Sequence, residues 1–213
     1  MEKKLIPGNR EKRNYAEELD TLIGELKASG RRSSLLLHAC CAPCASYPLE
    51  YLSPYFDITV FFYNPNMDSA QEYIRRSSEL ERFLVESKLP AKVIIREYDP
   101  DSFYAISRGL EGEPEGGERC FKCYGLRLKE TARLAAEKGF DYFATTLSIS
   151  PHKNAAKLNE IGEKVGFKYG VKHLPADFKK HDGFKRSIEL SMQYGLYRQS
   201  YCGCVYSKED DPA

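Results

Sequence analysis

Apolar residues follow two alternating patterns along the chain, short runs of strand character and longer stretches with helical spacing. Short apolar runs predict buried strands, whereas apolar residues at every third or fourth position predict amphipathic helices. The predicted strands are 35–38, 58–63, 93–95, 142–147 and 169–173. The predicted helices are 11–29, 46–52, 69–87, 118–139, 154–165 and 187–197.

Local signals set several boundaries of these elements. Gly30 is a C-cap that ends the first helix. Asp68 and Gln71 have the spacing of a capping box, in which Asp68 caps the helix and Gln71 reaches back. Residues 100–117 are predicted to be irregular, with a mobile loop at the Gly/Glu/Pro-rich part 112–117.

Strands that alternate with helices indicate an α/β fold, a three-layer sandwich around a mostly parallel five-stranded sheet. A length of 213 residues fits a single domain. We expect an N-terminal helical extension over 1–32, a core over 33–206 and a flexible tail over 207–213, whose last residues fray. Because ligands bind at the carboxyl ends of parallel strands, residues 40–44 and 150–154 should share one site.

Composition is ordinary for a soluble globular protein, with 42% hydrophobic and 30% charged residues. No signal peptide is apparent and no apolar run approaches the roughly 20 residues of a membrane span, so we expect a cytoplasmic protein. The net charge of +1 decides nothing about nucleic acid. Residues 151–200 nevertheless hold ten Lys/Arg against five acids, which suits either phosphate binding or a solvated basic face.

The seven cysteines all lie near another cysteine. In a reducing compartment, and with an odd count, they favour metal ligation or thiol chemistry over a disulfide framework. Cys40, Cys41 and Cys44 fall within five residues at the end of a buried strand, with Pro43 in the turn. Three thiols at a strand end are a poor choice for packing and a good one for metal or redox chemistry.

Cys120 and Cys123 lie three residues apart at a predicted helix start, hence on one face, where backbone N–H groups favour thiolates. Together with Cys40 and Cys41 they would provide four thiolates, enough for a cubane iron–sulfur cluster. A structural zinc site with four cysteines is the alternative. The spacing lacks the CxxxCxxC of radical SAM proteins.

Cys202 and Cys204 flank Gly203. A disulfide across one residue closes a small strained ring that is easily reduced, and glycine relaxes the backbone enough to permit it. We interpret the pair as redox-active. Two further metal ligands, or a free flexible pair, remain as alternatives.

Other candidate residues each have a structural alternative. His38 could ligate a metal or be a hydrogen-bonded core residue. The aromatic and cationic run 194–201 could stack on a base or pack as a helix end. The basic residues that could grip phosphates, or simply form a solvated face, are Lys153, Lys157, Lys179, Lys180, Lys185 and Arg186.

Five separated motifs in order resemble the QueH-type epoxyqueuosine reductases. The resemblance covers roughly residues 33–206 and leaves out the N-terminal helix and the acidic tail. The motifs are HACCAPC at 38–44, RCFKCY at 119–124, TTLSISPHKN at 145–154, DFKK at 177–180 and LYRQSYCGC at 196–204.

The resemblance implies an iron–sulfur-dependent oxidoreductase, acting on CH or CH2 groups, for the last step of queuosine synthesis. It would remove the epoxide oxygen of epoxyqueuosine at the wobble position of tRNA with GUN anticodons, using an external electron donor and no membrane. The fold would be Rossmann-like and related to the adenine-nucleotide hydrolase/PP-loop (HUP) group. Cysteines replace the phosphate loop of that group, which argues against ATP use.

The resemblance also implies site residues. A 4Fe–4S cluster would lie on Cys40, Cys41, Cys120 and Cys123, beside an additional mononuclear iron. Candidate ligands or catalytic groups near that iron are Cys44 and Asp177, and Cys202 with Cys204 would be the redox-active disulfide. For the mechanism itself we expect a general acid to protonate the departing oxygen, with His152 and His181 as candidates. The predicted tRNA-binding residues are Lys153, Lys179, Lys180, Arg186 and Arg198. A zinc-stabilised tRNA-binding module and a generic thiol–disulfide oxidoreductase are the competing hypotheses.

Overall fold

The computed structural model describes residues 13–208, so the expected fraying tail and the start of the first predicted helix lie outside the described residues. The strands are β1 (Ser33–Ala39), β2 (Phe56–Phe62), β3 (Ala91–Ile95), β4 (Tyr142–Thr145) and β5 (Lys172–His173). The α-helices are α1 (Tyr15–Ser29), α2 (Ala42–Leu52), α3 (Ala70–Ser87), α4 (Pro100–Ser107), α5 (Glu118–Glu137), α6 (Ala155–Tyr169) and α7 (Gly183–Gln193). Two short 3-10 helices are η1 (Thr146–Ile149) and η2 (Val205–Ser207).

The sheet has five strands in the order β3-β2-β1-β4-β5, and every neighbouring pair is parallel. The predicted α/β fold with a parallel sheet is therefore confirmed. The chain order reverses between β1 and β4, and ligands of open parallel sheets bind at the carboxyl ends of the strands beside such a reversal. Residues 40–44 follow β1 and 146–154 follow β4, so both reach this point.

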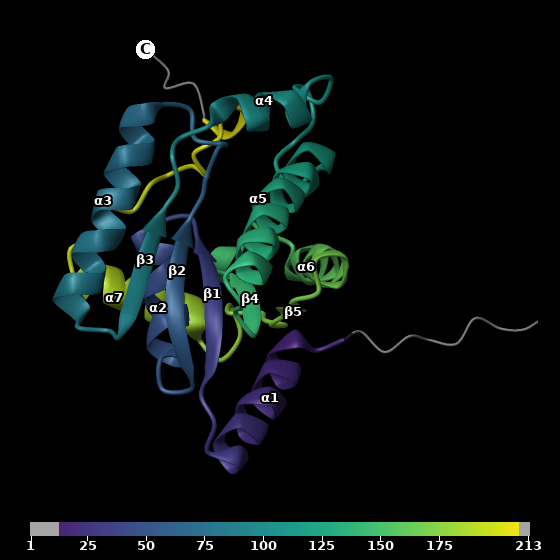
Figure 1. The fold of residues 1–213 in the computed structure, drawn as a ribbon. Coiled ribbons are helices and arrows are strands. Elements are labelled where there is room, and N and C mark those ends of the chain that lie inside the picture. The colour runs from purple at the N-terminus through teal and green to yellow at the C-terminus, as the bar shows by residue number, and fades with distance from the viewer. Residues whose placement is uncertain (1–12, 209–213) are drawn as a thin grey trace, which may run out of the picture.

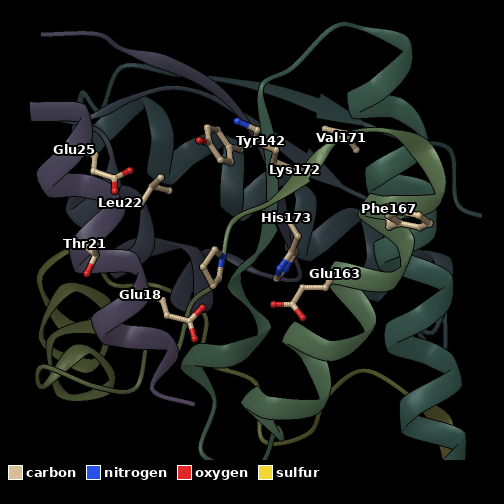
Figure 2. Close-up of a pocket in the computed structure, with 12 residues that line it drawn as sticks. Glu18, Thr21, Leu22, Glu25, Tyr142, Glu163, Phe167, Val171, Lys172 and His173 are labelled. Carbon is tan, nitrogen blue, oxygen red and sulfur yellow. The ribbon is translucent and has the colours of Figure 1, made fainter. Parts of the chain in front are cut away.

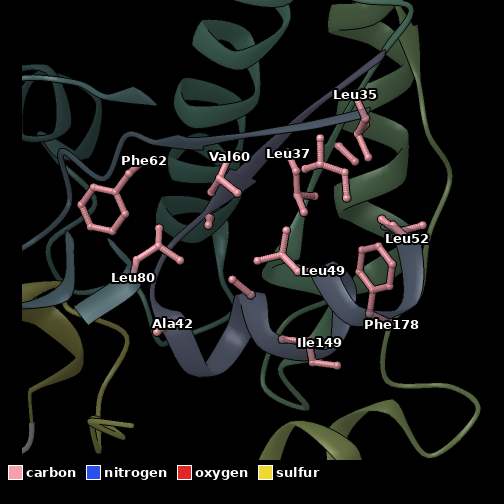
Figure 3. Close-up of a cluster of buried hydrophobic side chains, with 14 of the residues drawn as sticks. Leu35, Leu37, Ala42, Leu49, Leu52, Val60, Phe62, Leu80, Ile149 and Phe178 are labelled. Carbon is pink, nitrogen blue, oxygen red and sulfur yellow. The ribbon is translucent and has the colours of Figure 1, made fainter. Parts of the chain in front are cut away.

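Successive side chains of β1 point to opposite faces of the sheet and join different apolar clusters. Leu35 and Leu37 belong to the cluster beneath α2 and α3, together with Leu49, Val60 and Leu80 (Figure 3). Leu36 belongs to the cluster on the other face, which α5 and α6 cover (Figure 1). Because both faces are buried, the central strands read as continuous apolar runs rather than as alternating patterns.

The N-terminal helix packs on the same core. Its Leu19 and Ile23 are buried in the cluster of Leu35 and Leu37. Asn14 caps α1 by accepting from the amides of Ala16 and Glu17, and Gly30 ends it with a φ of 63°, as the sequence predicts. No helix within residues 13–208 is long and apolar enough to cross a membrane.

The predicted capping box of α3 is shifted by one residue. Ser69, not Asp68, caps the helix, and its hydroxyl accepts from the amide of Glu72. Asp68 lies just outside the helix and instead accepts from the hydroxyl of Tyr201 and the ammonium of Lys208. A long-range contact thus uses the carboxylate that the local pattern assigned to capping.

The segment 100–117 is not irregular throughout. Asp99 caps α4 and Pro100 occupies its first turn, where a missing amide donor costs nothing. On the buried face of this helix, Phe103 packs in one cluster with Cys123 and Cys204. Only the part after α4, which contains the predicted 112–117 loop, lacks helix and strand.

Other boundaries move where tertiary packing extends or ends an element. Helix α2 begins at Ala42 rather than at residue 46, so Cys44 lies in a helix and not in a turn. Strand β4 ends at Thr145, and η1 occupies the rest of the predicted strand. Helix α7 lies four residues earlier than predicted, and β5 contains only two residues.

Candidate functional site

The first thiol group, Cys40, Cys41 and Cys44, is positioned by the passage from β1 into α2. Cys41 is the N-cap residue of α2, and Pro43 fits the first turn because no intrahelical partner is needed there. The three sulfur atoms lie within 4.8 Å of one another, and those of Cys40 and Cys41 are 3.7 Å apart. Three buried or half-buried thiols at this spacing could hold a metal ion.

A second helix start brings Cys120 and Cys123 to the same region. The amide of Gly116 donates to Cys120 Sγ at 3.3 Å. A side chain at Gly117, the N-cap of α5, would approach Glu113 Oε2 to 2.6 Å, so the glutamate would have to move to admit it. Cys120 packs against the apolar cluster that contains Cys40 and Cys41. Both helices therefore present thiols at their N-termini, where partial positive charge favours anions.

The second thiol group, Cys202 and Cys204, lies in the C-terminal segment 196–208, which runs past α3 toward α4 (Figure 1). Both thiols are free in the structure. Cys202 Sγ lies 3.0 Å from the hydroxyl of Ser207. Cys123 and Cys204 are buried in one apolar cluster with Cys202 packed against it, so this group adjoins the start of α5.

One cavity of about 760 Å³ joins the two thiol groups. Cys40 and Cys44 line it from the first group and Cys202 from the second. Lys153, predicted from the exit loop of β4, lines it as well. The shared placement of residues 40–44 and 150–154 in one site, predicted from the strand order, is thus what the structure shows.

Two buried arginines, Arg76 and Arg127, lie near the thiols. Arg127 on α5 is 4% exposed and donates only to neutral oxygens, those of the Asn64 side chain at 3.4 Å and the Cys123 carbonyl at 3.5 Å. Burial alone would lower the pKa of Arg127, but the nearby thiols of Cys123, Cys40 and Cys202 raise it. Within residues 13–208 this guanidinium has no carboxylate partner, so its charge must be offset by an anion of the site.

The three thiols of the first group are linked to one another by hydrogen bonds. Hydrogen bonds from Cys40 and Cys44 hold the pKa of Cys41 well below its usual value, and Gln199 and Arg76 act in the same direction. The Gln199 amide donates to Cys41 Sγ at 3.0 Å. The hydrogen bond to Cys41 raises the pKa of Cys40 to about 11, and the hydrogen bonds to Cys40 and Cys41 raise the pKa of Cys44. Of the three thiols, Cys41 is therefore the one whose ionised form the surroundings favour.

The second group is arranged in the same way. A hydrogen bond from Cys204 lowers the pKa of Cys202 to about 5, against the effect of burial, and the ammonium of Lys153 and the hydroxyl of Ser207 assist. The bond to Cys202 and burial raise the pKa of Cys204. In each group one cysteine thus has a lowered pKa, which favours the thiolate, the nucleophilic and metal-binding form, beside a thiol that donates to it.

His38 is a core residue of β1 and not a free ligand. Its Nδ1 lies 2.9 Å from Thr145 Oγ1 and its Nε2 lies 3.1 Å from the carbonyl oxygen of Tyr63, so both nitrogens are engaged. Burial, with help from the charge of Arg127, lowers its pKa to about 4 and keeps it neutral. The hydrogen-bonding alternative for this residue is the one the structure shows.

The predicted basic residues near the cavity are largely engaged in internal contacts. Lys153 is 8% exposed and donates to Glu115 at 2.6 Å. Lys179 donates to the carbonyl of Ser148 at 2.9 Å and lies 2.9 Å from Asp177. Asp177 is not among the residues that line the cavity. These contacts fix the exit loop of β4.

The remaining predicted residues divide between the cavity and the outer surface. His152 and Arg198 are exposed and line the cavity. Lys180 is exposed, and Arg186 forms ion pairs with two glutamates, which leaves it at the surface. His181 pairs with Asp20 of α1 at 3.1 Å, away from the cavity lining.

The aromatic run 194–201 packs against α3. Tyr194 meets the ring of Phe83 edge-on at 5.3 Å, and Arg75 lies 3.4 Å from the ring centre of Tyr197. Tyr201 lies under the guanidinium of Arg76. The packing alternative accounts for these side chains.

Sequence reasoning missed Arg76, Arg127 and Gln199. A signal for the arginines is present in the pattern. Arg76 lies three residues after Tyr73 and four before Leu80, and Arg127 lies three after Tyr124, so both fall on the apolar face of a helix. A charged residue there must meet a buried partner.

A second cavity of about 590 Å³ lies between α1, α6 and β5 (Figure 2). Glu18, Glu163 and His173 line it, and none of the cysteines does. It belongs to the opposite end of the molecule from the thiol-lined cavity, beside the N-terminal helix. No predicted site residue lies there.

A parallel α/β sheet with a thiol-lined cavity beside the reversal of its strand order is typical of a protein with metal or thiol chemistry. The chain belongs to the QueH family, because the profile of "Epoxyqueuosine reductase QueH" matches residues 35–210. The resemblance in the cysteine motifs is thereby confirmed.

Proteins of this name are similar over most of their length. The Staphylococcus epidermidis protein is 43% identical over 203 residues, covering 92% of this chain and 85% of its own. The Streptococcus pyogenes protein is 44% identical over 201 residues, with 92% and 79% covered. The Thermotoga maritima protein is 34% identical over 177 residues, with 82% and 90% covered.

Proposed function

We propose that this protein is an epoxyqueuosine reductase, which removes the epoxide oxygen of epoxyqueuosine at the tRNA wobble position and leaves queuosine. The observation that carries the proposal is the cavity shared by Cys40, Cys44 and Cys202 above a buried guanidinium. A two-electron deoxygenation needs an electron source, a group that receives the oxygen and a proton. The cavity offers residues for each of these needs.

The donor set fits a 4Fe–4S cluster on Cys40, Cys41, Cys120 and Cys123. Two of these thiols follow β1 and two start α5, and all lie close to the apolar clusters around the cavity. Arg127, buried without a carboxylate within residues 13–208, supplies the positive charge that an anionic thiolate cluster needs. When bound, such a cluster would supply electrons one at a time.

Cys44 suits the predicted additional iron better than Asp177 does. Its sulfur lies within the first thiol group and lines the cavity. The Asp177 carboxylate is held by Lys179 and lies outside the cavity lining. We retain Cys44 as the candidate ligand there, and interpret Asp177 as a residue that positions Lys179 and through it the loop after β4.

The chain's own residues supply the dithiol and the proton. Cys202, beside Ser207 and Lys153, would form the redox-active disulfide with Cys204 and be restored by an external reductant. His152 lies exposed on the cavity wall, which suits a proton donor to the departing oxygen. His181 does not reach the cavity lining and is a weaker candidate.

Binding of tRNA is proposed for the cationic side chains that stay accessible around the cavity. Arg198 lines the cavity and is exposed, and Lys180 is exposed nearby in the chain after Lys179. Lys153 and Lys179 are engaged internally, so we assign them to the architecture of the site instead. The proposed substrate, tRNA with a GUN anticodon, implies a cytoplasmic location.

A kinship with the HUP group is also part of the proposal. The strand order β3-β2-β1-β4-β5 is that of a Rossmann-like sheet. In place of a glycine-rich phosphate loop after β1, this chain has cysteines and a proline at the start of α2. Cysteines thus occupy the helix N-terminus that would bind a phosphate in the HUP group.

Anaerobic turnover of epoxyqueuosine-tRNA tests the proposal directly. The wild-type protein should convert the substrate and carry about four or more irons, and Cys41→Ala should lose both properties. Wild-type rates in a cluster-free variant would refute the scheme. A colourless protein with one zinc and no turnover would favour a tRNA-binding module, and reduction of small disulfides without iron a thiol oxidoreductase.

A further inference from the structure

Arg76 on α3 lies between the two thiol groups. Its side chain is 1% exposed, and its Nε donates to Glu72 Oε1 at 2.6 Å, one turn earlier on the helix. Burying an arginine is costly unless its donors are used. The direction of the remaining donors therefore indicates what this residue is for.

One donor holds the backbone of the second thiol group. Arg76 Nη1 donates to the carbonyl oxygen of Cys202 at 3.2 Å. Gly203 has a φ of 99°, which favours glycine, and a side chain there would come within 3.1 Å of Nη1 and press on the guanidinium. The amide of Asp68, just before α3, donates to the carbonyl of Gly203 at 2.8 Å.

The same guanidinium acts on the first thiol group. Burial alone would lower the pKa of Arg76, but the charge of Cys41 raises it, together with Glu72. Gln199, from the C-terminal segment, donates to Cys41 Sγ. Arg76 thus lies close to Cys41 and also holds the backbone of Cys202, and Gln199 connects the C-terminal segment to Cys41.

One donor of Arg76 remains unused. Nη2 is buried and has no hydrogen-bond partner among residues 13–208. An unsatisfied buried donor costs free energy, so the position has a role beyond packing. The side chain ties the second thiol group to α3 and keeps a positive charge at the first.

We propose that Arg76 is a positioning residue that fixes the second thiol group beside the first and favours its reduced, dithiol form. A Cys202 to Cys204 disulfide closes a strained ring and changes the torsions around Gly203, whereas Arg76 and Asp68 fix the backbone found with both thiols free. The inference rests on the redox role proposed for these two cysteines.

The test is a thiol–disulfide equilibrium in glutathione buffers. Glutathione disulfide takes two electrons from the two thiols, so that Cys202 and Cys204 join, and two glutathione thiols, which receive both protons, are released. Alkylation and mass spectrometry give the equilibrium constant. Losing a charged hydrogen bond should raise the constant for Arg76→Met about tenfold or more, and less for Arg76→Lys.

Arg75→Met is the matched control, because Arg75 is exposed and contacts the same segment through Tyr197 without facing a thiol. It should keep the wild-type constant. If Arg76→Met fails to fold, Glu72→Gln combined with Arg76→Met removes both buried charges and gives the same readout. A wild-type constant in the folded Arg76 variants would overturn the inference.

Hydrogen exchange of the amides in 196–208 separates this inference from the proposed function. Faster exchange in Arg76→Met, with wild-type exchange in Arg75→Met, supports the positioning role even if no disulfide forms in the wild-type protein. Failure to form that disulfide would count against the redox role of the cysteines. Unchanged exchange in Arg76→Met would count against the role of Arg76.

Discussion

The two thiol groups that share the cavity are held in different ways. Cys40, Cys41 and Cys44 stand on the backbone of β1 and α2, which the ladders to β2 and β4 fix on both sides. Cys202 and Cys204 stand on a segment that forms no strand of the sheet and is held by side chains and by the amide of Asp68, just before α3. Rigid elements suit a bound cofactor, whereas a tethered segment suits a pair that must open and close.

The largest difference should appear when each group is removed in turn. Cys41→Ala should lose bound iron and turnover almost completely, because a ligand on the rigid part is gone. Cys202→Ala should keep the iron and its charge-transfer colour but lose turnover with the external reductant. Iron analysis and anaerobic turnover check both results. Loss of iron in Cys202→Ala would show that the two groups are one metal site.

Substitution of Arg127 tests whether its buried positive charge serves to bind an anion at the first thiol group. Arg127→Met should raise the free energy of unfolding of the metal-free protein by about 1–4 kcal/mol, because it removes a buried charge without a carboxylate partner. The same variant should hold iron less firmly. Urea unfolding without metal and iron release to a chelator measure the two effects. A lower free energy of unfolding together with unchanged iron release would mean that the cation serves packing alone.

The pH dependence of the free energy of unfolding tests His173, which lies in neither thiol group. Burial, assisted by Arg13, lowers the pKa of His173 to about 3, whereas a histidine in the unfolded chain has a pKa of about 6.5. Between these values the unfolded state binds more protons, so the free energy of unfolding falls as the pH falls. His173→Asn should remove up to about 2 kcal/mol of the difference between pH 7 and pH 5. Urea unfolding at both pH values measures it, and an unchanged difference would contradict the assignment.

The smallest effect should separate local strain from docking in the C-terminal segment. Gly195 and Gly203 both have positive φ, but only a side chain at Gly203 would meet Arg76. Gly195→Ala should cost about 1–2 kcal/mol of strain. Gly203→Ala should cost more and speed hydrogen exchange across 196–208. Equal costs and equal exchange would show that docking against Arg76 contributes little.

The sequence alone determined the class of fold, the family and the cysteines that gather at the site. Continuous apolar runs predicted the central strands β1 and β2 because both of their faces are buried, and helical spacing located most helices. The cysteine motifs identified the family and the two thiol groups. Residues 40–44 and 150–154 could be placed together because they follow parallel strands, whose ends meet at one edge.

Only the tertiary structure decided how the groups are connected. Contacts between residues far apart in the sequence carry no local signal. Asp68 was therefore predicted as the cap of α3, whereas in the structure its carboxylate accepts from Tyr201 and Lys208. Burial of Lys153 turned a predicted phosphate contact into an internal ion pair. Arg76 and Arg127 stayed hidden because an arginine on an apolar face shows that a partner exists but not which one, and that partner is set by packing.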